Sequence, residues 1–175
     1  DLHNGEYEKA SLLLSKNKQS VWYQADAEVS LFWDLAEQCE RMLGCIRKAN
    51  GELNNLKELT TWYAEQGFQV DTAFRRYQQK ISTSDEDNAS IAELSKFVYA
   101  QYRSFTEQIQ QKYQKAIIEE DYPIPSIASN VTFWQTYVEP LLNQHKRVVV
   151  LFADAFRYEM GKDLSASLGN SYTVD

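Results

Sequence analysis

The longest amphipathic segment of the sequence is the feature that most constrains the fold. Between residues 90 and 118, apolar side chains recur every three or four positions, while Gln, Lys and Glu occupy the remaining positions. This pattern predicts a helix with one apolar stripe. The stripe consists of Ile91, Leu94, Phe97, Val98, Tyr102, Phe105, Ile109, Tyr113 and Ile117. Such a helix would be roughly 40–45 Å long. We therefore expect it to lie along a helical bundle and not inside a compact α/β core.

The residues before this segment also have helical periodicity. We expect helices over residues 5–16, 25–48, 52–66 and 70–81, with a polar loop over residues 82–90. The third of these should stop at Gly67, and Asp71 is a plausible N-cap of the fourth. Together with the long helix, these segments predict a helical domain over residues 1–121.

The pattern changes after residue 121. Pro123 and Pro125 break the helix, which predicts a linker over residues 122–128. Residues 129–143 look helical, with Pro140 either kinking that helix or opening a second one. Residues 147–153 form a continuous β-branched and apolar run, typical of a strand covered on both faces, and residues 156–168 are helical again. The predicted fold is mainly α: a helical bundle followed by the first β–α unit of a truncated α/β domain over residues 129–175.

Composition excludes several classes of protein. The 175 residues carry a formal net charge of −7, which argues against a general nucleic-acid-binding domain. The sequence has no apolar run long enough to span a membrane and no secretory signal. Cys39 and Cys45 should face different sides of one helix, and two unpaired thiols fit a reducing cytoplasm. Because the sequence begins at Asp1 and stops where a second strand would start, we expect an excised piece of a longer protein.

Asp154 and Arg157 are the candidate site residues. Ligands of parallel sheets bind beyond the carboxyl ends of the strands, where Asp154 would lie. Its carboxylate could hold a divalent cation, or it could cap the following helix. Arg157 could bind a phosphate through its guanidinium, or it could pair with Glu159 or with the helical domain. We expect Glu159 and Lys162 to be ordinary surface residues.

Other candidates are weaker. His145 precedes the predicted strand and Asp154 follows it, so the two should not share a site. The tyrosines and tryptophans, interleaved with Arg75, Arg76 and Arg103, could stack on nucleic-acid bases. Packing within the bundle is the commoner explanation for aromatic residues on helix stripes.

Residues 148–159 (VVVLFADAFRYE) resemble the opening motif of the PglZ domain. The segments 70–77 (VDTAFRRY), 97–102 (FVYAQY) and 133–138 (FWQTYV) are similar to the helical region that precedes this domain in the type A proteins. PglZ proteins belong to the alkaline phosphatase superfamily and are components of BREX bacteriophage-defence systems.

The resemblance implies a role for Asp154. It corresponds to the first-strand aspartate that binds a divalent metal, usually zinc, in the superfamily. The nucleophile is a Thr or Ser from a later element, and Ser171 and Thr173 lie too early to be that residue. The resemblance therefore implies a metal-dependent phosphatase or phosphodiesterase, with no catalytic residue within this chain, which should be inactive alone and bind no metal alone.

The resemblance also implies partners, a substrate class and a localisation. The partners would be other BREX defence proteins, with DNA or a phosphorylated substrate reached through the intact protein, in the cytoplasm. The alternative is a helical interaction or scaffolding module of the defence complex.

Overall fold

A computed structural model describes residue 2, residues 4–49, residue 53 and residues 55–82, 88–120, 130–169 and 171–172. The elements within these residues are helical throughout. They are α1 (Tyr7–Lys18), α2 (Val21–Ala25), α3 (Ala27–Lys48), α4 (Leu56–Trp62), the π-helical turn η1 (Tyr63–Gly67), α5 (Phe68–Ile81), α6 (Ala89–Glu119), the 3-10 turn η2 (Asn130–Thr132), the π-helical turn η3 (Trp134–Val138), α7 (Glu139–Asn143) and α8 (Tyr158–Leu168). None of them is both long and apolar enough to cross a membrane.

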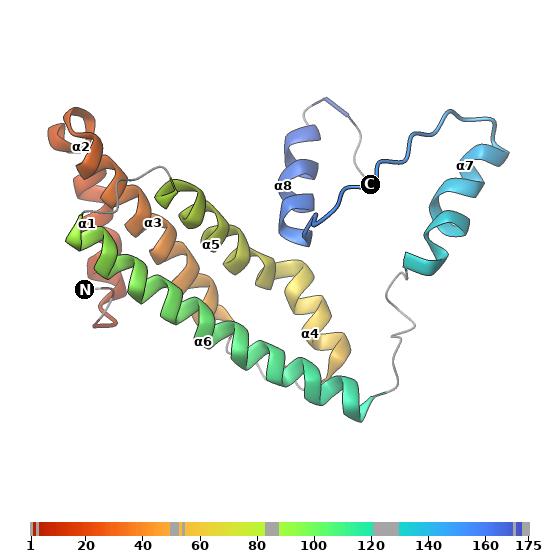
Figure 1. The fold of residues 1–175 in the computed structure, drawn as a ribbon, viewed down its shortest axis with the longest axis horizontal. Coiled ribbons are helices and arrows are strands. Elements are labelled where there is room, and N and C mark those ends of the chain that lie inside the picture. Colours follow the sequence, from red (N-terminus) through yellow and green to blue (C-terminus); the bar gives the residue numbers. More distant parts are fainter. Residues whose placement is uncertain are drawn as a thin grey trace.

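Three long helices form the body of the bundle (Figure 1). α3 and α6 run in the same direction, and α5 lies beside them in the opposite direction. α1 and α2 pack at one end of α3, while α4 packs against the other end of α6. The prediction that the long helix lies along a bundle is therefore confirmed. α8 packs on α5, whereas α7 lies away from the bundle (Figure 1).

The apolar stripes of α3, α5 and α6 meet in one core. Its fully buried side chains include Leu35, Met42, Val70 and Tyr77. The Tyr77 hydroxyl lies 2.7 Å from Ser95 Oγ, so the one polar group of that side chain is satisfied. Removal of this much apolar surface from water is the main force that holds the three helices together.

Polar contacts fasten the short helices to this core. Asp34 of α3 accepts hydrogen bonds from Tyr23 Oη at 2.7 Å and from Lys80 Nζ at 2.8 Å. Lys18 Nζ forms an ion pair with Asp34 Oδ1 at 3.0 Å. Burial alone would raise the pKa of Asp34, but hydrogen bonds from Lys80, Tyr23 and Lys18 outweigh it and lower the pKa to about 2. The ionised Asp34 thus links α1, α2, α3 and α5.

The prediction that a helix stops at Gly67 is wrong. α4, η1 and α5 follow one another without a break, because a π-helical turn carries the chain through Gly67 in a right-handed helical conformation. Glycine is needed there for space: a Cβ at residue 67 would lie 2.7 Å from the Trp62 ring. Asp71 consequently lies within α5 and does not cap it.

Gly67→Ala is expected to reduce the free energy of unfolding by about 1–3 kcal/mol, since the added methyl group overpacks against Trp62. The Trp62 ring has little room to retreat, because its centroid lies 6.1 Å from that of Phe105. Gly44→Ala in α3 is the matched control, as its Cβ would meet nothing closer than 3.9 Å, and it should stabilise by about 0.5–1 kcal/mol. Urea unfolding of both variants should give opposite signs; stabilisation by both would contradict the packing role of Gly67.

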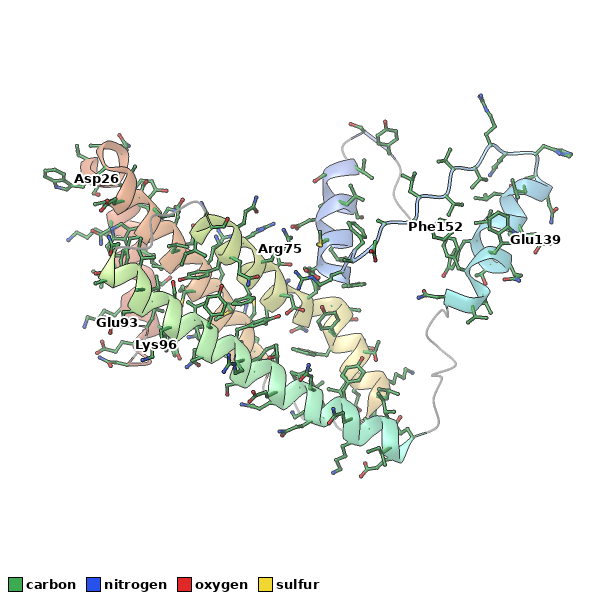
Figure 2. The ribbon with its side chains drawn as sticks, viewed as in Figure 1. Asp26, Arg75, Glu93, Lys96, Glu139 and Phe152 are labelled. Atoms are coloured by element: carbon green, nitrogen blue, oxygen red, sulfur yellow. The ribbon has the colours of Figure 1, made fainter. Side chains whose placement is uncertain are left out.

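The predicted strand over residues 147–153 is not formed in the described residues, where this run has no regular secondary structure. A strand needs hydrogen bonds from a neighbouring strand, and none of the described segments supplies them. Val149, Leu151 and Phe152 are 82%, 87% and 90% exposed, and Figure 2 shows Phe152 well away from the bundle. Pro140 opens α7, and α8 ends at Gly169 as predicted. The linker predicted over residues 122–128 lies outside the described residues.

Candidate functional site

Asp154 lies in an exposed turn just before α8. Its Oδ1 accepts a hydrogen bond from the Ala155 amide at 2.8 Å, and Ala155 has a positive φ of 52°. The N-cap position of α8 is taken by Arg157, and no side chain caps that helix. Helix capping, one of the two roles considered for Asp154, is therefore not what its side chain does, and the residue is exposed to solvent.

The described residues do not bring further metal ligands to Asp154. No group of three or more His, Cys, Asp and Glu side chains that could hold a metal ion occurs among them. His145 is exposed and belongs to no such group. Asp154 is thus suited to be one oxygen ligand of a divalent cation, but the part of the chain described by the structure does not complete a site.

Glu159, in the first turn of α8, is fully buried, so the prediction that it is a surface residue is wrong. Its Oε1 lies 3.2 Å from Arg157 Nε and 3.8 Å from Arg75 Nε of α5. Four residues further along α8, Asp163 pairs with Nη2 of Arg75 and, at 3.1 Å, with Nη2 of Arg76. Two carboxylates on one face of α8 therefore meet two adjacent arginines of α5.

Aromatic packing completes this contact between α8 and the bundle. The Tyr158 ring lies 5.9 Å from the rings of both Tyr63 and Phe68, and its hydroxyl donates to the Ala64 carbonyl at 3.1 Å. Lys162 Nζ lies 5.6 Å from the Phe68 centroid. Ala64 and Tyr63 belong to η1, so the π-helical turn forms part of the surface on which α8 sits.

A second polar cluster adjoins Glu159. Asp71 accepts hydrogen bonds from Tyr63 Oη at 2.6 Å and from Tyr102 Oη at 2.7 Å. Burial, followed by the hydrogen bond to Asp71, raises the pKa of both tyrosines. Glu159 raises the pKa of Tyr102 further, while Arg157 opposes that effect. Both hydroxyls therefore stay protonated and act as donors to Asp71.

The aromatic side chains pack as expected. Tyr102 stacks on Phe74 with ring centroids 3.7 Å apart, and Tyr77 is fully buried. Arg75 and Arg76 are occupied by acidic partners. These residues are therefore not arranged for base stacking.

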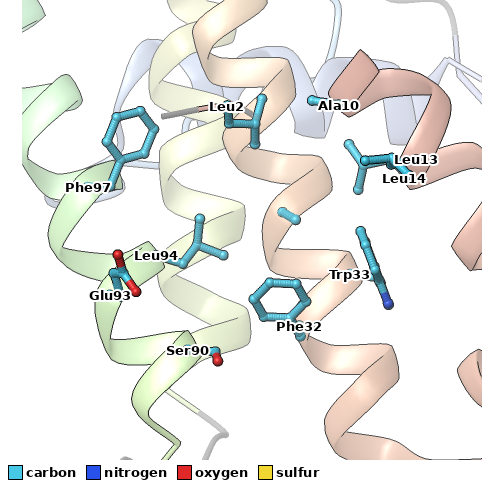
Figure 3. Close-up of a pocket in the computed structure, with 11 residues that line it drawn as sticks. Leu2, Ala10, Leu13, Leu14, Phe32, Trp33, Ser90, Glu93, Leu94 and Phe97 are labelled. Carbon is cyan, nitrogen blue, oxygen red and sulfur yellow. The ribbon is translucent and has the colours of Figure 1, made fainter. Parts of the chain in front are cut away.

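An apolar pocket of about 380 Å³ lies between α1, α3 and α6. Phe32 and Trp33 of α3 and Leu94 and Phe97 of α6 contribute to its walls (Figure 3). Glu93 and Ser90 supply its few polar groups. It is far from Asp154 in sequence and contains none of the residues that contact α8.

Sequence reasoning missed the buried contact between α5 and α8. Arg75 and Asp163 are 88 residues apart, so no local periodicity connects them. One signal was present: Glu159 and Asp163 are four residues apart and share one helix face, and the adjacent Arg75 and Arg76 offer the complementary charge.

Two curated proteins resemble the chain. It is 28% identical over 109 residues to the alkaline phosphatase-like protein PglZ of Bacillus cereus (strain H3081.97), a match that covers 61% of this chain. It is 25% identical over 162 residues to the alkaline phosphatase-like protein BrxZ of Escherichia coli O9:H4 (strain HS), which covers 87% of this chain. The chain therefore resembles alkaline phosphatase-like proteins named PglZ and BrxZ. It spans only 13% and 19% of the lengths of these two relatives. No protein-family model and no solved structure matches it.

Proposed function

We propose that the chain forms the helical region and the first metal-ligand motif of a metal-dependent phosphatase or phosphodiesterase. The observation that carries the proposal is the similarity to two proteins named alkaline phosphatase-like, together with the exposed carboxylate of Asp154 at the start of α8. Because the chain spans a small part of those relatives, the remaining ligands and the nucleophile would belong to a longer protein.

The chemistry follows from the metal. A divalent cation, zinc by the resemblance, would polarise the phosphoryl oxygens and activate a hydroxyl nucleophile or water. Asp154 would be one ligand of such a site. Its Oδ1 accepts a hydrogen bond from the Ala155 amide, and this hydrogen bond would orient the carboxylate so that its other oxygen can bind the cation. Since three or more ligands are needed, residues 1–175 alone should bind no metal and be inactive.

The exposed apolar run supports the same proposal. Val149, Leu151 and Phe152 leave large side chains in solvent, which a single helical domain has no reason to do. In the longer protein, residues 147–153 would pair as a strand of a parallel sheet and bury both faces. That pairing would create the β–α unit and place Asp154 at the carboxyl end of the strand.

The setting would be bacteriophage defence. By resemblance, the protein would act in the cytoplasm with other BREX proteins, and DNA or a phosphorylated molecule would be its substrate. The acidic net charge of −7 indicates that residues 1–175 would not themselves be the main contact with DNA.

A scaffolding role is the second candidate, favoured by the helical bundle that the described residues form. In that case the helical bundle would bind other defence proteins and the phosphatase-like fold would be kept for structure.

Metal dependence of the longer protein separates these two functions. We expect hydrolysis of a chromogenic phosphodiester or monoester to stop after treatment with a chelator and to return when zinc is added. Metal content measured in parallel should rise and fall with activity. A longer protein that binds no metal and hydrolyses neither substrate would favour the scaffold.

A further inference from the structure

We propose that Glu159 is a positioning residue that ties Arg157, and with it the Asp154 turn, to the helical bundle through Arg75. The phosphate-binding consequence of this inference rests on the proposed function. The link between the three side chains does not, because it is a property of the bundle and α8 themselves.

Glu159 is shared between two arginines on different parts of the chain. Its Oε1 lies 3.2 Å from Arg157 Nε and 3.8 Å from Arg75 Nε. Both contacts are ion pairs: among the described residues, neither Glu159 oxygen nor Arg75 Nε has a hydrogen-bond partner. A fully buried carboxylate without hydrogen bonds stays charged only if nearby cations compensate for the lost hydration. Glu159 therefore needs at least one of these two arginines as a counter-ion, and it pairs with both of them.

The ion pair fixes one edge of the Arg157 guanidinium and leaves the other edge exposed. A guanidinium has five N–H donors in a rigid plane. Glu159 contacts the Nε edge, while the Arg157 side chain is 57% exposed. The two Nη groups can therefore bind a phosphate bidentately only three residues after Asp154. Arg157 can thus pair with Glu159 and bind a phosphate at the same time.

Arg75 gives this arrangement its anchor in the bundle. It lies on α5, which forms the core with α3 and α6, and its Nη2 also pairs with Asp163. An ion pair between Arg76 Nη2 and Asp163 Oδ1, 3.1 Å apart, holds the next turn of α8 against α5. Figure 2 shows Arg75 on the side of α5 that faces α8. Asp163 therefore holds α8 against α5, and Glu159 connects Arg157 to the same arginine of α5.

A double-mutant cycle on residues 1–175 tests the link. Arg75→Gln and Arg157→Gln are made singly and together, in the native background and in Glu159→Gln, and native-state hydrogen exchange gives the opening equilibrium of α8 amides. With Glu159 present, loss of one arginine leaves the other as counter-ion, but loss of both leaves a buried charge unpaired. We expect the double variant to open about 10-fold more than the two single effects combined. In Glu159→Gln the effects should combine without coupling.

Controls keep these results interpretable. Lys162→Gln removes an exposed cation from α8 without touching Glu159 and should not change the coupling. Exchange of amides in α3 and α6 reports whether each variant still folds. Additive effects of Arg75→Gln and Arg157→Gln, or a coupling that persists in Glu159→Gln, would overturn the link through Glu159.

A second measurement tests the phosphate role in the longer protein. Glu159→Gln should weaken inhibition by inorganic phosphate about 10-fold, similarly to Arg157→Gln, whereas Lys162→Gln should not. Unchanged inhibition in Glu159→Gln, with hydrolysis intact, would overturn the positioning of Arg157. If the longer protein has no hydrolytic activity, the proposed function fails, and the exchange cycle still decides whether Glu159 links Arg75 to Arg157.

Discussion

Asp154→Asn in the longer protein should lower kcat/KM for metal-dependent phosphoester hydrolysis by at least about 100-fold. Loss of partners that merely orient metal ligands already costs about 10–100-fold, so loss of a ligand itself should cost more. The asparagine keeps the shape of the side chain and can still accept the Ala155 amide, but it lacks the negative charge that a divalent cation requires. Steady-state kinetics at several zinc concentrations measure the effect.

Glu139→Gln is the matched control. Glu139 is an exposed carboxylate in the same C-terminal part of the chain, so its neutralisation tests whether a general loss of negative charge reduces activity. We expect it to leave kcat/KM within about 2-fold. Unchanged turnover of Asp154→Asn at saturating metal would contradict the assignment of Asp154.

Asp71→Ala should reduce the free energy of unfolding of residues 1–175 by about 2–4 kcal/mol. The Asp71 carboxylate accepts hydrogen bonds from both Tyr63 and Tyr102, which are half-buried. A fully buried hydroxyl left without an acceptor costs about 1–3 kcal/mol, so each of these two should cost toward the lower end of that range. Because the two tyrosines belong to η1 and α6, the variant should also loosen the contact between these elements. Urea unfolding followed by circular dichroism measures the loss.

Two companions separate the hydrogen bonds from other effects of the substitution. Asp71→Asn keeps an oxygen that accepts from one tyrosine, so it should cost less than Asp71→Ala. Tyr63→Phe combined with Tyr102→Phe removes both donors and should make a further Asp71→Ala change much less costly. A full additional loss in that background would contradict the role of Asp71 as acceptor for the two tyrosines.

The sequence was informative where structure depends on local periodicity. The stripe from Ile91 to Ile117 predicted α6 to within one residue at each end, as well as its position along the bundle, because burial of one helix face leaves a regular pattern. The three- and four-residue spacing of residues 25–48 likewise predicted α3. The start of α8 was misplaced by two residues, since helix ends depend on caps more than on periodicity.

The sequence was misleading where structure depends on distant partners. Gly67 has the appearance of a helix terminator, but its role is to accommodate the Trp62 ring. Asp71 has the appearance of an N-cap, but its two carboxylate oxygens accept hydrogen bonds from the hydroxyls of Tyr63 and Tyr102, which are 8 and 31 residues away. Glu159 was expected to be an ordinary surface residue. It is buried because Arg75 on α5 supplies the second counter-ion.

At the candidate site, some features follow from local sequence and others depend on distant partners. Asp154 was chosen from its position after an apolar run, and the structure shows that it is exposed and does not cap α8. The strand that should precede it is not formed in the described residues, because pairing requires a neighbouring strand. The contact that holds the turn in place, through Glu159, could be found only with coordinates.

The most direct test of the account is anomalous diffraction at the zinc edge from crystals of the longer protein. We predict a metal ion about 2.0–2.2 Å from a carboxylate oxygen of Asp154, with residues 147–153 paired as a strand immediately before it. A zinc ion bound by a complete set of ligands that leaves Asp154 out would contradict the account.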